Sequence, residues 1–169
     1  MVKRLLQALG LLVVVVVGAG LAFVEFDLSF DELKDTYVSP SSQFIDLPDG
    51  SRAHVRDEGN RNGYPLILVH GSTASLHTWE PWVKELGNTY RIVSMDLPGH
   101  GLTGATPSGD YSRDAMVEFV RDVMDALGID RAALAGNSMG GGVVAAFAED
   151  YPTRVSHLIL ISSAQSISS

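Results

Sequence analysis

The sequence predicts an α/β fold built on a mostly parallel, doubly wound sheet. Short apolar runs alternate along the chain with segments whose apolar residues recur every three to four positions, as expected for strands followed by covering helices. The runs at residues 66–69, 132–135 and 158–161 are apolar throughout, which is typical of parallel strands buried on both faces. About 130 residues belong to this pattern, enough for one globular domain.

The first segment, residues 1–24, is predicted to be a transmembrane signal-anchor. Residues 5–24 carry no charge, and as a helix they would span ~30 Å, the thickness of one hydrocarbon core. Lys3 and Arg4 precede this run and acidic residues follow it, so the positive-inside rule places the domain on the periplasmic or extracellular side. A cleaved signal peptide is the alternative, because residues 20–22 form a small-x-small site, and the protein would then be secreted.

Residues 25–41 are polar and acidic, and we expect a linker with little structure. The predicted domain, residues 42–169, opens with an antiparallel hairpin. Its two strands, 43–47 and 52–56, flank Pro48-Asp49-Gly50, which is a strong turn signal.

Strands and helices then alternate along the chain. The further predicted strands are residues 65–69, 90–95, 132–135 and 155–161, and the predicted helices are residues 79–86, 112–127 and 141–148. The helix at 112–127 has apolar residues at three-and-four spacing, and Gly128 is a natural stop at its C-terminal end.

The segment Gly136-Asn137-Ser138-Met139-Gly140 has the G-x-S-x-G pattern of a nucleophile elbow, between a predicted strand and a predicted helix. Such a turn holds the serine oxygen clear of the sheet, and Gly136 and Gly140 supply the small residues that it needs. Ser138 is therefore the candidate nucleophile. The N–H of Met139, at the helix N-terminus, is a candidate donor to a developing oxyanion, an interaction worth roughly 3–4 kcal/mol.

Two further motifs accompany the elbow. His70-Gly71-Ser72 follows the third predicted strand, and residues 96–104, DLPGHGLTG, follow the fourth. With GNSMGG, these ordered motifs resemble the α/β-hydrolase superfamily over about residues 42–169. The resemblance implies an α/β-hydrolase fold with a second oxyanion donor in the loop after the third strand. The N–H of Ser72 is the candidate for this donor, with Thr73 next to it.

The resemblance implies a serine hydrolase that acts on ester-type carbonyl bonds of a small molecule, without a cofactor. Serine at position 138 excludes the related haloalkane dehalogenases and epoxide hydrolases, which have an aspartate there. Carbon–carbon bond hydrolases of ring-cleavage products share the GNSMGG elbow and rank second, because their oxyanion loop is richer in Gly and Pro than residues 72–75. Acyl transfer at the same site is a further alternative.

The triad acid and histidine that the resemblance implies are not present in this chain. In the family they follow later strands, or the acid follows the sixth strand, where residues 162–166 contain no carboxylate. We therefore expect the fold to be truncated after the sixth strand, with an exposed apolar edge. A serine without a base is a poor nucleophile, so we expect the chain alone to be nearly inactive. A non-catalytic hydrolase-like module is the alternative.

The composition excludes several other function classes. The net charge is −8, which argues against nucleic acid as an electrostatic partner. There is no cysteine, so a thiol nucleophile or a Cys-based metal site is excluded. No metal-ligand spacing and no dinucleotide-binding motif occurs, and we expect neither a metal nor a cofactor.

Overall fold

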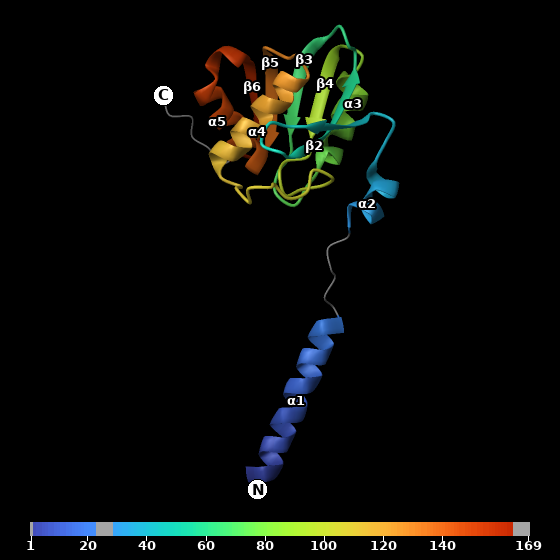
Figure 1. The fold of residues 1–169 in the computed structure, drawn as a ribbon, viewed down its shortest axis with the longest axis vertical. Coiled ribbons are helices and arrows are strands. Elements are labelled where there is room, and N and C mark those ends of the chain that lie inside the picture. The colour runs from blue at the N-terminus through green and yellow to red at the C-terminus, as the bar shows by residue number, and fades with distance from the viewer. Residues whose placement is uncertain (1, 23–28, 164–169) are drawn as a thin grey trace.

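The fold is α/β and is built on one mostly parallel sheet with helices on both faces, as the sequence predicts. The computed structural model describes residues 2–22 and 29–163. Within them, six strands form one sheet in the order β1-β2-β4-β3-β5-β6 (Figure 1). The strands are β1 (Ser42–Asp46), β2 (Arg52–Gly59), β3 (Tyr64–Val69), β4 (Tyr90–Met95), β5 (Ala132–Asn137) and β6 (Val155–Ile161). The helices are α1 (Val2–Ala22), α2 (Phe30–Tyr37), α3 (Glu80–Leu86), α4 (Arg113–Ala126) and α5 (Met139–Asp150). Short 3-10 turns lie at Leu76–Trp79 and Pro152–Arg154.

The sheet is antiparallel at one side and parallel elsewhere. Strands β1, β2 and β4 pair antiparallel, whereas β4, β3, β5 and β6 are parallel neighbours. The predicted hairpin and the four later strands are therefore confirmed. The helices predicted at 79–86, 112–127 and 141–148 are confirmed as α3, α4 and α5, with small differences at their ends.

Helices cover the two faces of the sheet. On one face α4 and α5 pack in the larger core, with Ile67, Val93 and Leu134 of the sheet beneath them. On the other face Trp79, which immediately precedes α3, packs in a smaller cluster on the alternate residues of the same strands, such as Leu68. Figure 1 shows α4 in front of the sheet and α3 at its other side. This alternation of side chains between two cores is the reason why the parallel strands are apolar throughout.

The strand order places the candidate site. From β3 the chain passes to β4 on one side and later returns to β5 on the other side, so the connections diverge at the carboxyl ends of β3 and β5. In open α/β sheets ligands bind at such a divergence. Here Ser72 follows β3 and Ser138 follows β5.

A helix lies in the segment that was predicted to have little structure. The helix α2 begins after Ser29, whose hydroxyl accepts from the N–H of Glu32, while the Glu32 carboxylate accepts from the N–H of Ser29. This reciprocal capping box is a recognised start signal, and S-F-D-E carries it in the sequence. The expectation for residues 25–41 is therefore wrong for Phe30–Tyr37, because it weighed polarity and not the cap. Residues 25–28 lie outside the described part.

The N-terminal segment is helical as α1 over Val2–Ala22. Across the described residues we find no helix that combines the length and the apolar composition needed to cross a bilayer. The predicted transmembrane anchor is therefore not supported. The last two residues of the predicted span, Phe23 and Val24, lie outside the described part.

Candidate active site

The turn after β5 has the geometry of a nucleophile elbow. Ser138 has φ 51° and ψ −115°, a conformation that L-residues rarely adopt, and its side chain is exposed. It is the N-cap residue of α5, at the positive end of the helix dipole, and its hydroxyl makes no capping hydrogen bond to the first turn. Its own N–H donates to the carbonyl of Ile161 at 2.9 Å, which ties the turn to β6.

The two elbow glycines are required by close backbone contacts. A Cβ atom at Gly136 would overlap the carbonyl of Gly140, and a Cβ atom at Gly140 would overlap the carbonyls of Val69 and His70. The strand–turn–helix unit therefore packs against the end of β3 with no room for a side chain. These contacts agree with the small-residue rule on which the sequence interpretation rests.

The loop after β3 lies beside the nucleophile. A Cβ atom at Gly71 would lie 3.1 Å from the Cβ of Ser138. The hydroxyl of Ser72 donates to the sulfur of Met139 at 3.3 Å. The structure thus brings together Ser138, Met139 and Ser72, the three residues predicted to form the reacting centre. Their catalytic roles stay predictions.

Strained backbone conformations cluster after the carboxyl ends of the parallel strands. Among the described residues, the non-glycine residues with positive φ are Thr73, Ser138 and Ser162, at 53°, 51° and 50°. They follow β3, β5 and β6, three neighbouring parallel strands. Residues in such conformations persist only where the surroundings fix them, and they cluster at active sites.

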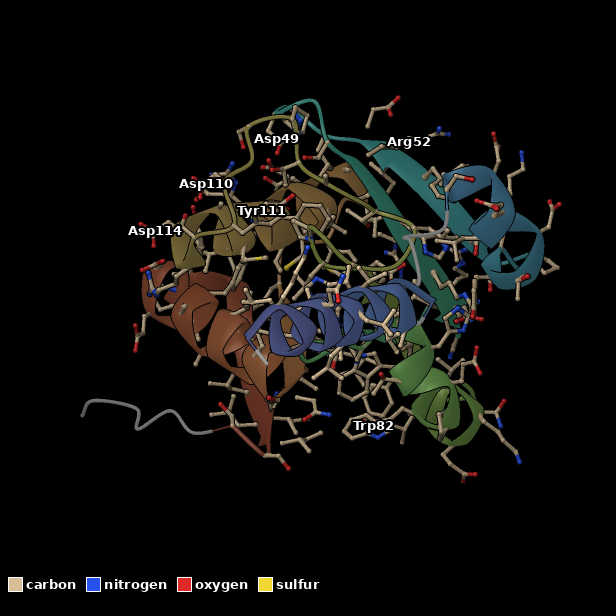
Figure 2. The ribbon with its side chains drawn as sticks, turned by 90° about the horizontal axis from the view of Figure 1, so that it is seen from below. Asp49, Arg52, Trp82, Asp110, Tyr111 and Asp114 are labelled. Carbon is tan, nitrogen blue, oxygen red and sulfur yellow. The ribbon has the colours of Figure 1, made fainter. Side chains whose placement is uncertain are left out.

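A cavity of about 520 Å³ opens beside Ser138. Its walls come from α5, from the loop after β6, and from the start of α4 with the residue Tyr111 that precedes it (Figure 2). Sequence reasoning missed Tyr111 and Arg113 as cavity residues, because no motif marks them. Arg113 forms ion pairs with Asp150 and Glu149 at 3.3 Å each, which fixes it at the cavity wall.

His70 is bound by hydrogen bonds at the start of the loop that bears Ser72. Its Nδ1 donates to the carbonyl of Gly71 at 2.7 Å, and its Nε2 accepts the N–H of Leu97 at 3.0 Å. The ring is fully buried, and this burial lowers its pKa against the opposing effects of the Gly71 carbonyl and Asp96. Since Nε2 must accept a hydrogen bond, the neutral ring is the form that fits here.

The other histidines are also bound away from Ser138. His54 contacts Asp96, His77 contacts Glu80, His100 contacts the carbonyl of Pro98, and His157 contacts Ser156. Within the described part of the chain, no hydrogen bond joins the Ser138 hydroxyl to a histidine, and no group of metal-ligating side chains is found.

Comparison with known proteins identifies the family. The model of the alpha/beta hydrolase fold family matches residues 64–169, well over half of the chain. The chain belongs to the α/β hydrolase family. The expected superfamily is therefore confirmed, on a match that contains the loop after β3, the turn after β4 and the elbow.

The similar proteins include two hydrolases. The chain is 37% identical over 118 residues to a 2-hydroxymuconate semialdehyde hydrolase from Pseudomonas sp. (strain CF600), covering 68% of this chain and 41% of that protein. It is similar to the structure of a meta-cleavage product hydrolase from Pseudomonas fluorescens IP01, with TM-score 0.67 and 33% identity over 72% of this chain and 45% of that chain.

A second similar structure covers more of this chain. It is that of a membrane phospholipase A, a bacterial virulence factor, with TM-score 0.71 and 29% identity over 96% of this chain and 52% of that chain. The chain spans about two fifths of the length of the curated relatives that it matches.

Proposed function

We propose that this chain carries the nucleophile and the oxyanion site of a serine hydrolase. The observation that carries the proposal is the exposed, strained position of Ser138 at the N-terminus of α5, beside the loop that bears Ser72. Ser138 Oγ attacks a carbonyl carbon, and the N–H groups of Met139 and Ser72 donate to the oxyanion that forms. Each such donor contributes roughly 3–4 kcal/mol to the transition state. The glycines at 136 and 140 allow the approach of strand and helix that this geometry needs.

The base and the acid belong to the same proposal. More than half of the first relative's length lies outside its match with this chain. We propose that the general base and its acid come from the corresponding sequence, after β6. Without a base, Ser138 is expected to be nearly unreactive, since loss of the base in a serine protease costs on the order of 10⁶ in turnover.

A carbon–carbon bond beside a carbonyl group is the preferred substrate bond. The names of the relatives at 37% and 33% identity support this alternative over ester hydrolysis. In this reaction Ser138 forms an acyl–oxygen bond, and the bond from the acyl carbon to the neighbouring carbon breaks. The leaving carbon takes a proton, and water then hydrolyses the acyl-serine to a carboxylic acid. The net reaction adds H to one fragment and OH to the other.

Ester hydrolysis is the second candidate, and one observation favours it. The similarity to the membrane phospholipase A extends over 96% of this chain, further than the 72% matched by the meta-cleavage product hydrolase. The same nucleophile and oxyanion donors serve both reactions, because each begins with attack on a carbonyl carbon.

The test begins with the source gene beyond the codon for Ser169. If the reading frame continues, the complete product is assayed with a 2-hydroxy-6-oxo dienoate and with a p-nitrophenyl ester. We expect the dienoate to be preferred and Ser138→Ala to lose at least ~10³-fold in turnover, together with labelling by a fluorophosphonate. Ser108→Ala, on an exposed loop, is the control. Full activity in Ser138→Ala would overturn the proposal, and a preference for the ester would favour the second candidate.

The cellular location is a separate proposal that rests on charge asymmetry alone. Lys3 and Arg4 precede the N-terminal apolar run and acidic residues follow it. We propose that the domain lies on the periplasmic or extracellular side, as an anchored or a secreted protein. Protease accessibility in intact spheroplasts tests this, and a domain that is protected until lysis contradicts it.

A further inference from the structure

A network of buried, hydrogen-bonded polar groups lies next to the loop that bears Ser72. Asp96, at the carboxyl end of β4, is 1% exposed, yet its carboxylate accepts three hydrogen bonds. The donors are Nδ1 of His54 at 2.8 Å, the N–H of Leu76 at 2.8 Å and the N–H of Leu102 at 2.9 Å. Gly101 has φ +49°, and a Cβ atom there would overlap this carboxylate. The turn after β4 is therefore shaped around Asp96.

The donors and acceptors of the bonds among Ser42, His54 and Asp96 can be assigned. Burial opposes ionisation of Asp96, but the bonds from His54, Leu76 and Leu102 outweigh it and hold the pKa of the carboxyl below its ordinary value. The ionised carboxylate can only accept, so Nδ1 of His54 carries a proton. In the neutral ring Nε2 then accepts the hydroxyl of Ser42, 2.8 Å away. We call Ser42, His54 and Asp96 the Asp96 relay.

The Asp96 relay has the order of a Ser-His-Asp triad, but its surroundings exclude a second hydrolytic site. The His54 ring is fully buried and stacks on the ring of Phe44, with centroids 5.0 Å apart and planes at 22°. The Ser42 hydroxyl also accepts the N–H of Ser39 at 3.1 Å. Neither the cavity beside Ser138 nor the one between Thr73 and Leu102 has Ser42 or His54 in its walls. The Ser42 hydroxyl is thus occupied by two hydrogen bonds and the His54 ring is closed off from solvent, so we assign the relay a different use.

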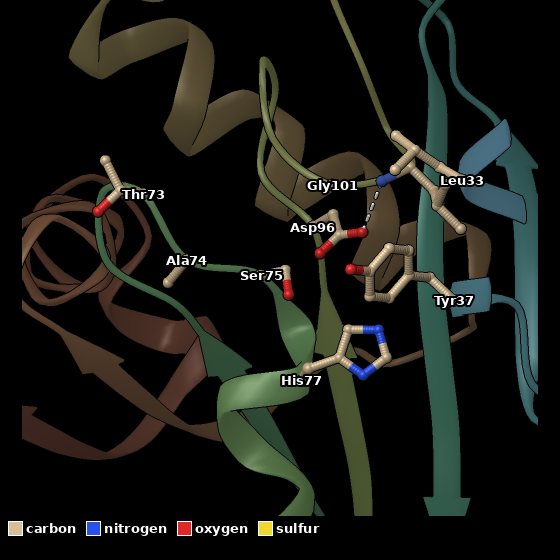
Figure 3. A pocket seen from close by; sticks show the side chains of 9 residues that line it. Leu33, Tyr37, Thr73, Ala74, Ser75, His77, Asp96 and Gly101 are labelled. Carbon is tan, nitrogen blue, oxygen red and sulfur yellow. Dashed lines mark hydrogen bonds between the residues drawn. The ribbon is translucent and has the colours of Figure 1, made fainter. Parts of the chain in front are cut away.

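The relay fixes one end of the loop that bears Ser72. Leu76, bound to Asp96, closes this loop, while His70 opens it and is bound to the N–H of Leu97, the residue after Asp96. The two ends of the loop are thus attached to adjacent residues of one turn. Figure 3 shows Asp96 between the loop of Thr73–Ser75 and helix α2.

We propose that His54 and Asp96 are positioning residues that set the direction of the Ser72 N–H, and thereby the oxyanion site. This inference rests on the proposed function, in which that N–H is an oxyanion donor. A carboxylate that accepts three bonds in a buried site allows little rotation, because each donor would lose a charge-assisted hydrogen bond. Ser42 acts through His54, since its hydroxyl restricts the rotation of the imidazole.

The test uses backbone amide spectra of the 169-residue chain, which do not depend on activity. In His54→Gln the hydrogen bond from the imidazole to Asp96 is lost, and the carboxylate is held less firmly. We therefore expect the Leu76 amide, which donates to the same carboxylate, to exchange roughly tenfold faster. We also expect a shift of the Ser72 amide resonance. Ser42→Ala should shift it in the same direction but less, and Ser42→Thr, which keeps the hydroxyl, should restore the wild-type position.

Val55→Ala is the matched control, because Val55 neighbours His54 on β2 and is fully buried in the core. It should lower stability but leave the Ser72 resonance in place. An unmoved Ser72 resonance in His54→Gln, or an equal shift in Val55→Ala, would overturn the inference. If His54→Gln does not fold, the pair Ser42→Ala and Ser42→Thr decides alone. Failure of the proposed function is seen separately, as hydrolysis that does not need Ser138.

Discussion

At the scale of single residues, the elbow lowers the stability of the fold in two ways, through backbone strain at one residue and through steric exclusion at another. Ser138 is held at φ 51°, and Gly140 sits where any side chain would meet backbone. A strained turn of this kind exposes the Ser138 side chain but leaves no tolerance for larger residues at the glycines. Backbone strain and steric exclusion have different physical origins, so their effects on the free energy of unfolding can be measured separately by substitution.

Gly140→Ala tests the steric cost. The added methyl group would overlap the carbonyls of Val69 and His70, which cannot move without displacing β3. We expect the free energy of unfolding to fall by about 3 kcal/mol, the upper part of the range for overpacking. Gly109→Ala is the control, because Gly109 has φ +67° with open space around it, so only the conformational cost of about 1 kcal/mol applies. Urea unfolding measures both, and equal losses would contradict the steric explanation.

His70, at the start of the loop that bears Ser72, makes the stability of the fold depend on pH. Burial is the main cause of its lowered pKa, so between that pKa and the ordinary value of 6.5 the unfolded chain binds more protons than the folded chain. The contribution of His70 to the free energy of unfolding is therefore fully present above about pH 6.5, and it decreases as the pH falls toward the lowered pKa. We expect the urea midpoint to fall between pH 7.5 and 5, and to fall less in His70→Asn.

Carboxyl groups also titrate near the lower end of that range, so the difference between variants is the informative quantity. His157→Asn is the control, because His157 is exposed on β6. It should keep the wild-type dependence. An unchanged slope in His70→Asn would contradict the assignment of the effect to the buried ring.

At the scale of elements, α2 shows how a short polar helix is stabilised. Its eight residues bury none of their side chains fully, so propensity and packing contribute little. The capping box at Ser29 supplies two hydrogen bonds, and Phe30 packs edge-on against Phe44 of β1 with ring centroids 5.6 Å apart. The helix is thus fixed at its start, next to the first strand.

Ser29→Ala should therefore unwind α2 without unfolding the domain. Loss of an N-cap costs about 1 kcal/mol, which is large for an isolated short helix and small for the whole fold. Faster amide exchange confined to Phe30–Tyr37, with an unchanged urea midpoint, is the expected result. Ser29→Asp keeps an N-cap acceptor and should retain slow exchange. A large fall in the midpoint would mean that α2 is part of the cooperative core.

The same elements show what the sequence could predict. The parallel strands were predictable because burial on two faces makes them largely apolar, and the elbow was predictable because its sequence pattern lies within five consecutive residues. The helix α2 was also predictable from its local capping box, S-F-D-E, but the polar composition of the segment outweighed that signal. The bond between His54 and Asp96 joins residues 42 positions apart, and no local pattern carries it.

At the scale of the whole molecule, the two edge strands of the sheet differ in how far they are covered by other elements. One edge is the β1 strand, next to α2, and the other edge is β6, which pairs only with β5 among the described residues. Beside β6 lies an apolar cavity of about 650 Å³, walled by Leu66, Leu158 and Trp82 of α3 (Figure 2). An exposed strand edge next to an apolar surface is a template for pairing with another chain.

We therefore expect the 169-residue chain to self-associate through β6. Ile159 is 38% exposed on this strand, and Ile159→Lys would place a charge on the surface that two copies would share. Sedimentation at several concentrations should show association for the wild type and a monomer for Ile159→Lys. Ser108→Lys adds the same charge to an exposed loop far along the chain and should still associate. Association that persists in Ile159→Lys would exclude β6 as the contact. If the monomeric variant keeps the wild-type urea midpoint, the edge contributes to association only, and the six-stranded sheet is stable without a covering partner.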